Sequence, residues 1–127
     1  MGYITSKPAS GGGGGPSTGG VLVTAALAAG ANNDFNPGGA FPVGVGRLDL
    51  DSTAGVATVT GLLAGSDGQQ VFIRNKPGGN NVTLMNANGG SAAANQFTSS
   101  DDIILTPGTA VVLMYTAGAI NKWALAP

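Results

Sequence analysis

The stretch Thr58 to Asn75, TVTGLLAGSDGQQVFIRN, decides the fold class of this chain. Its β-branched start and its apolar run Val71 to Ile73 both favour strands. Between them, Ser66-Asp67-Gly68 supplies a turn in which the glycine takes a positive φ. The stretch therefore predicts a strand, a loop and a second strand.

The second of these strands has two different faces. Side chains alternate across a sheet, so Val71 and Ile73 share one face while Phe72 and Arg74 share the other. We expect the first face to lie in the core. The second face is apolar with a charge at its edge.

Short strands are also expected on both sides of this stretch. The segment GVLVTAALAA, residues 20–29, is compatible with a strand or with a helical turn, and we favour the strand. Arg47 to Asp51 alternates, which places Leu48 and Leu50 inward and the charges on a solvated face. The remaining strands are expected at Val82 to Met85, Ile103 to Leu105, Thr109 to Thr116 and Asn121 to Leu125, and loops at residues 30–45 and 91–100.

The last strands carry the most apolar pattern. Pro107-Gly108 fits a type II turn, so we expect a hairpin there. The strand Thr109 to Thr116 is apolar on both faces, which is typical of a central strand or an interface. In the final strand Trp123 and Leu125 point inward and Lys122 outward, and we interpret Trp123 as a core anchor rather than a platform for a sugar.

The spacing of these elements predicts an all-β fold. Roughly seven or eight short strands with frequent turns indicate an antiparallel β-sandwich or a jelly-roll-like, partly closed barrel over residues 21–127. Residues 1–20 are rich in glycine and proline and are expected to form an extended arm.

The composition limits the classes of function. Charged residues make up 9% of the chain, against about a quarter in a typical soluble domain. Such a neutral surface favours coverage by other subunits or a partner, although a soluble monomer is the alternative. A net charge of −1 with scattered basic residues argues against nucleic-acid binding. No apolar run is long enough for a membrane span and no signal-peptide pattern is present, so we expect a cytosol-like compartment and no membrane contact.

Few residues here suit catalysis or metal binding. The chain has neither histidine nor cysteine. Asp49 and Asp51 would lie about 7 Å apart on one strand face, a spacing compatible with a glycosidase, but a solvated strand face is the favoured interpretation. Asp34 and the pair Asp101-Asp102 could bind a hard cation, yet their spacing fits no known Ca²⁺ loop. We therefore expect no enzyme, no catalytic residues, no metal and no cofactor.

Three segments in succession resemble a known family. GLLAGSDGQQVFIRN, NNVTLMNANGGSAAANQF and LTPGTAVVLMYTAGAINKW together resemble a small β domain that recurs in virion proteins of tailed bacteriophages, including tail fibres and head-decorating proteins. The upstream NNDFNP and GRLDL fit the same pattern, so the resemblance extends over Ala31 to Leu125. The chain departs from the pattern at Gln96, where the family often has arginine.

The resemblance implies a homotrimeric structural module for assembly or display. One module with an arm is the shape expected of a capsid decoration (cement) protein. Such a protein would bind the major capsid protein of the same virus on the virion surface. A tail-fibre or receptor-binding module that contacts a host glycan through its long loops is the alternative. The expected capsid contacts of the arm are Tyr3, Ile4, Lys7 and Pro8, and the expected subunit interface comprises Phe72, Met85, Val112 and Met114.

Overall fold

A computed structural model of the chain describes residues 21–38, 41–118 and 122–125. In these residues the strands form a six-stranded and a four-stranded sheet, with one short 3-10 helix, η2. The six-stranded sheet has the order β1-β3-β5-β9-β10-β7 and the four-stranded sheet the order β2-β4-β6-β8. The elements are β1 (Val21–Ala26), β2 (Gly30–Asn32), β3 (Val45–Asp51), β4 (Ala57–Val59), β5 (Gln70–Asn75), β6 (Val82–Leu84), η2 (Ala93–Asn95), β7 (Phe97–Thr98), β8 (Ile103–Leu105), β9 (Ala110–Thr116) and β10 (Lys122–Leu125).

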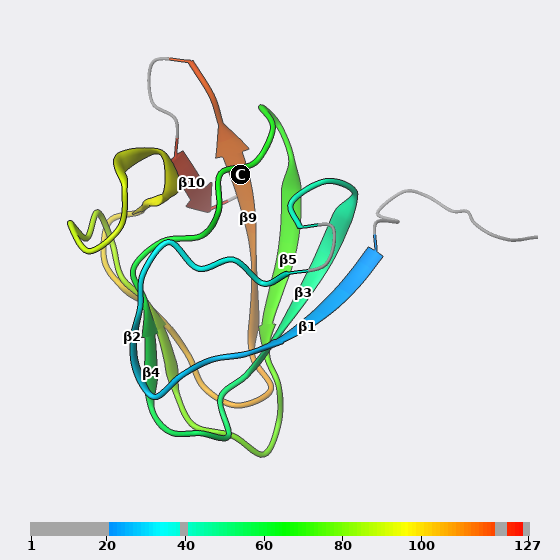
Figure 1. The fold of residues 1–127 in the computed structure, drawn as a ribbon, viewed down its shortest axis with the longest axis vertical. Helices are drawn as coiled ribbons and strands as arrows, with labels where there is room; N and C mark the ends of the chain where they lie inside the picture. The colour runs from blue at the N-terminus through cyan, green and yellow to red at the C-terminus, as the bar shows by residue number, and fades with distance from the viewer. Residues whose placement is uncertain (1–20, 39–40, 119–121, 126–127) are drawn as a thin grey trace, which may run out of the picture.

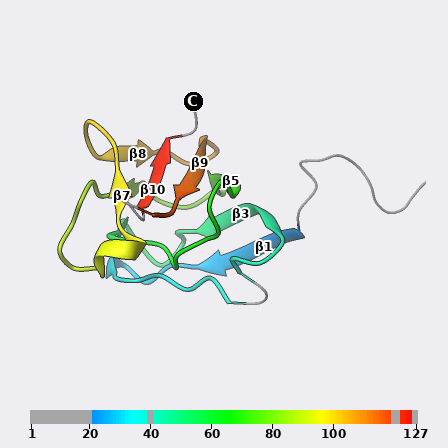
Figure 2. The same ribbon diagram turned by 90° about the horizontal axis from the view of Figure 1, so that it is seen from above.

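The first six strands wind as a β-solenoid. The chain alternates between the two sheets, and each strand pairs in parallel with the strand one coil earlier. Leu22 lies beside Arg47 and Arg47 beside Phe72, a step of 25 residues at each coil. Figures 1 and 2 show β1, β3, β5 and β9 side by side in this order. An isolated parallel bridge between Phe35 and Leu62 joins the coils on a further side.

This winding confirms the all-β class and corrects the expected antiparallel sandwich or barrel. The predicted turns exist, since Gly68 and Gly108 have φ of 81° and 88°. However, the turn at Pro107-Gly108 joins β8 of the four-stranded sheet to β9 of the six-stranded sheet, so it does not form the expected hairpin. The turns are corners between sheets, and the pairing partners come from neighbouring coils.

Strand direction reverses at β8 and β9. β8 pairs antiparallel with β6, and β9 pairs antiparallel with β5. β10 then pairs antiparallel with β9 and parallel with β7. These strands close the C-terminal end of the solenoid, and β9 is central, as its two apolar faces predicted.

The core lies between the sheets and is anchored by Trp123. Its side chain is fully buried, and its Nε1 donates to the carbonyls of Leu62 at 3.1 Å and Leu63 at 3.2 Å. The ring stands edge-on to Tyr115 with centroids 5.1 Å apart. The prediction for Trp123 is therefore confirmed. Leu125, expected inside, is 48% exposed, so that part of the prediction is wrong.

Buried Asn75 fixes the corner where β5 ends. Its Nδ2 donates to the carbonyls of Asn80 and Leu105, both at 2.8 Å. Its Oδ1 accepts a hydrogen bond from Ser52 Oγ at 2.9 Å. One amide thus joins two successive coils to β8.

Other local expectations had mixed outcomes. The strand favoured over residues 20–29 is β1. The two expected loops contain β2, η2 and β7, which are too short to show an alternating pattern. The arm, with Tyr3, Ile4, Lys7 and Pro8, lies outside the described residues.

Candidate functional site

The candidate site is the outer face of the six-stranded sheet. In this face, register aligns Leu22, Arg47, Phe72 and Val112 in one row. A second row holds Thr24, Asp49, Arg74 and Ala110. Met114 lies in a third row between Gln70 and Ala124. We call these eleven residues the outer face.

Alternation sets the composition of this face. Leu48, Val71 and Leu113 point into the core and are buried, so their neighbours along each strand must point outward. On β5 this leaves Phe72 41% exposed. The two-faced pattern predicted for Val71 to Asn75 is therefore confirmed.

Three of the four residues expected at a subunit interface meet on this face. Phe72 lies beside Val112 in register, and Met114 lies one row away on β9. Met85 does not join them. It follows β6 in the four-stranded sheet, where its backbone N–H donates to the carbonyl of Val59 at 2.9 Å.

Two arginines enclose a carboxylate on the same face. Arg74 Nη2 donates to Asp49 Oδ2 at 2.9 Å, and its Nε donates to Oδ1 at 3.3 Å. Arg47 approaches the same two oxygens at 3.3 and 3.4 Å. The Asp49 side chain is only 6% exposed, against 44% for Arg47 and 30% for Arg74. The expected solvated strand face is thus wrong at Asp49, because the guanidinium groups cover it.

This cluster also determines the protonation of Asp49. Burial raises the pKa of the Asp49 carboxyl, but hydrogen bonds from Arg74 and Arg47 and their charges lower it more. The net pKa lies below its ordinary value. Asp51, beside it on β3, accepts hydrogen bonds from Thr53 that lower its pKa as well. A glycosidase needs one carboxyl whose pKa is raised, so this pair lacks the required acid.

Two of the other acidic residues singled out in the sequence, Asp34 and Asp102, hold loops in place. Asp34 Oδ1 accepts hydrogen bonds from Ala92 N at 2.7 Å and Asn95 Nδ2 at 2.8 Å, and both lower its pKa. Asp102 Oδ1 accepts one from Asn86 N at 2.8 Å. Within the described ranges, no group of three or more acidic, histidine or cysteine side chains is placed to hold a metal ion.

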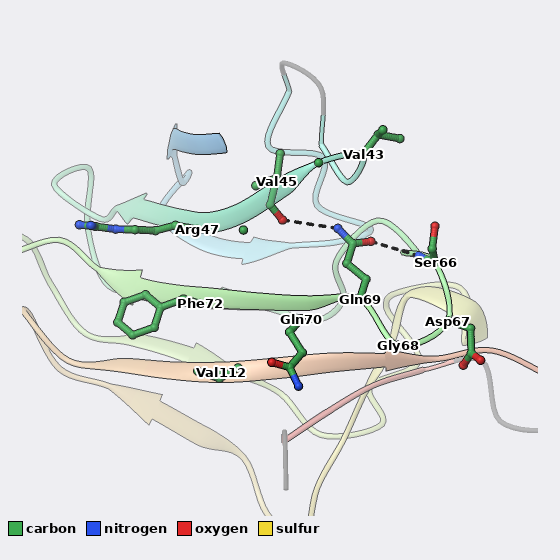
Figure 3. A pocket seen from close by; sticks show the side chains of 12 residues that line it. Val43, Val45, Arg47, Ser66, Asp67, Gly68, Gln69, Gln70, Phe72 and Val112 are labelled. Atoms are coloured by element: carbon green, nitrogen blue, oxygen red, sulfur yellow. Dashed lines mark hydrogen bonds between the residues drawn. The ribbon is translucent and has the colours of Figure 1, made fainter. Parts of the chain in front are cut away.

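An open groove adjoins the apolar part of the outer face (Figure 3). Its volume is about 1120 Å³, and it is lined by residues 43–47, residues 66–70, Phe72 and Val112. Gln69 fixes its wall: its Oε1 accepts from Ser66 N at 3.1 Å, and its Nε2 donates to the carbonyls of Pro42 and Val45. The groove therefore combines one exposed aromatic ring with an arginine and amide groups.

Sequence reasoning missed the groove and the arginine cluster. Arg47 and Arg74 meet at Asp49, and Gln69 reaches the carbonyls of Pro42 and Val45, because successive coils stack, which no local pattern indicates. The alternation on β3 and β5 places both arginines on outward-facing positions, but it does not indicate that the two strands are neighbours.

Comparisons with known proteins give no family. No protein-family model matches the chain, and neither curated proteins nor solved structures give a significant match. In the described part of the chain, no helix has the length and apolar character of a membrane span.

Proposed function

We propose that this protein is a non-enzymatic structural component of a bacteriophage virion, which decorates the capsid and stabilises the head. It acts as a homotrimer that binds the major capsid protein of the same virus. The arm, through Tyr3, Ile4, Lys7 and Pro8, and the outer face both contribute contacts.

The observation that carries this proposal is the apolar part of the outer face. Phe72, Val112 and Met114 lie together on a central part of the sheet, and Leu22 lies further along the row of Phe72, on the other side of Arg47. Phe72 is 41% exposed and Val112 and Met114 are half-buried. On a chain with 9% charged residues, such an apolar area in the middle of an uncovered sheet face is typical of a surface that packs against another protein. The resemblance to phage virion modules supplies the kind of partner.

The first test changes the face and keeps the fold. The double variant Phe72→Ser/Met114→Ser should lose about tenfold or more in affinity for undecorated shells of the same virus, since apolar burial at the interface is removed. Ile104→Ser is the matched control, because Ile104 is 63% exposed on the other sheet. Equal affinity of both variants for shells would contradict the proposal.

The second test addresses the arm and the trimer. Deletion of residues 1–15 should weaken shell binding, and unchanged affinity would remove the arm from the mechanism. Analytical ultracentrifugation of the unmodified protein in solution should give the mass of three chains. A monomer at micromolar concentration would contradict the trimer.

The groove favours one alternative, a tail-fibre or receptor-binding module for a host glycan. Sugars bind where an aromatic ring lies beside planar polar side chains, and Phe72 lies in the groove with Arg47 and Gln70. Labelling the protein in intact particles separates the two functions. A signal confined to tails, together with loss of glycan binding in Gln70→Ala, would favour the alternative over decoration.

A further inference from the structure

The outer edge of β1 is the longest sheet edge that lacks protection. β1 is the terminal strand of its sheet, and in the described residues no strand lies on its other side. It has six residues, VLVTAA, without charge or proline, and Val21 and Leu22 are 58% and 50% exposed. The other edge strands, β2, β7 and β8, have only two or three residues. Proteins normally shorten, charge or cover such an edge.

The free hydrogen-bonding groups of this edge can be assigned. Val21 N–H donates to the carbonyl of Gly44 and Leu27 N–H to that of Asp51, both on the β3 side. Because backbone groups alternate along a strand, Leu22, Thr24 and Ala26 direct their N–H groups to the open side. These three amides need a partner strand or water.

We propose that residues 3–7 of the same chain, Tyr-Ile-Thr-Ser-Lys, add to β1 as an antiparallel strand. This segment begins with good strand formers, and it precedes β1 in the chain by a linker of glycine, proline and small polar residues. Such a linker of residues 8–20 has a mean span of about 20 Å. A six-residue strand is also about 20 Å long, so the segment reaches the whole edge.

The segment suits this edge better than a second copy of β1 does. A pair of six-residue strands buries far less than the roughly 800 Å² per partner of a stable interface. A tethered strand needs less contact, because the linker holds it at an effective concentration of about a millimolar.

Alternation gives the added strand a defined orientation. Placing Ile4 inward, opposite Val23 or Ala25, covers the end of the core, where Val23 packs but remains only half-buried. Tyr3, Thr5 and Lys7 then extend the outer face. The pairing assigns Ile4 to the core end, which replaces the capsid contact proposed for it above, and it leaves Tyr3 and Lys7 open to a partner. It holds whether or not the protein binds a capsid.

Amide hydrogen exchange on the isolated full-length protein tests this. Leu22, Thr24 and Ala26 should exchange about tenfold or more slowly than unpaired amides, and the double variant Ile4→Pro/Thr5→Pro should abolish this protection. Val23 and Ala25, which face β3, are internal controls and should keep their protection. Gly13→Pro/Gly14→Pro places the same prolines in the linker and should change nothing. Fast exchange of the three amides, or protection that survives the prolines at 4 and 5, would overturn the proposal.

Cross-linking distinguishes the same chain from a second copy. The chain has no cysteine, so Thr5→Cys can be combined in turn with Leu22→Cys, Thr24→Cys and Ala26→Cys, which covers the possible registers. We expect a disulfide within one monomer for one of these pairs, and none for Thr5→Cys/Ile104→Cys. A disulfide-linked dimer, or no disulfide in any pair, would overturn it.

Discussion

At its C-terminal end the solenoid finishes on the edge strands β7 and β8, which have only two and three residues, whereas at its N-terminal end the six-residue β1 has no outer strand neighbour among the described residues. Trp123 at the closed end is fully buried, while Leu22 at the open end is 50% exposed. In a stack of parallel coils, the outermost strand at each end has backbone N–H and C=O groups that no further coil can pair. Each end therefore needs a separate solution. This chain uses strand reversal and an aromatic plug at one end and leaves a strand edge at the other.

The largest effect is expected from the plug. Trp123→Ala should lower the free energy of unfolding by about 3–5 kcal/mol, since it empties the space beside Tyr115 and leaves two carbonyls without their donor. Denaturant unfolding measures this. Leu125→Ala, on the same strand but half exposed, should cost less than about 1 kcal/mol. Similar losses for both variants would mean that the end is not closed by the indole.

The second-largest loss of stability is expected at Asn75, in the corner where β5 ends. Asn75→Ala should cost about 2–4 kcal/mol, because it leaves the buried carbonyl of Leu105 and the Ser52 hydroxyl without this partner. Unfolding of exposed Asn81→Ala is the control and should change little. A cost under about 1 kcal/mol for Asn75→Ala would show that water replaces the amide.

The open end can be compared with the middle of the same sheet by one kind of substitution. Val71 and Val23 both face the core from the six-stranded sheet, but Val71 is fully buried and Val23 only half-buried. Val71→Ala should cost about 2–3 kcal/mol and Val23→Ala about 1 kcal/mol. Equal losses of unfolding free energy, measured by denaturant unfolding, would mean that the Val23 side chain is covered as well as the Val71 side chain. Repeating Val23→Ala in the Ile4→Pro/Thr5→Pro background would show whether residues 3–7 supply that cover.

Local patterns could predict the strands but not their partners. Val71, Ile73, Leu48 and Leu50 follow a simple alternation, and the glycines at 68 and 108 mark real turns. The same signals serve a hairpin and a solenoid corner, and a three-residue strand such as β2 is too short to alternate. The repeat is also hidden, because the stacked residues Leu22, Arg47 and Phe72 have unlike side chains.

The candidate site was predictable in part for the same reason. Alternation places Phe72, Val112 and Met114 on outward faces, and stacking then brings these three together. Met85 has a similar apolar side chain but follows a strand of the other sheet. Burial of Asp49 depends on Arg74 one coil later, a distance of 25 residues that only the register reveals.

The smallest expected effect concerns the charges that join β3 to β5. The pKa of Asp49 is lowered in the folded state, so its stabilising contribution is complete above the unfolded pKa of about 4 and is lost as pH falls through the folded value. Because both arginines are partly exposed, we expect Asp49→Asn to cost about 1 kcal/mol at pH 7. The difference in unfolding free energy between this variant and the unmodified protein should then shrink toward acid pH. Exposed Asp101→Asn is the control for the loss of one negative charge. A difference for Asp49→Asn that stays constant down to pH 2 would mean that the coils are joined there by packing of the arginine stems, and that the ion pairs contribute nothing measurable.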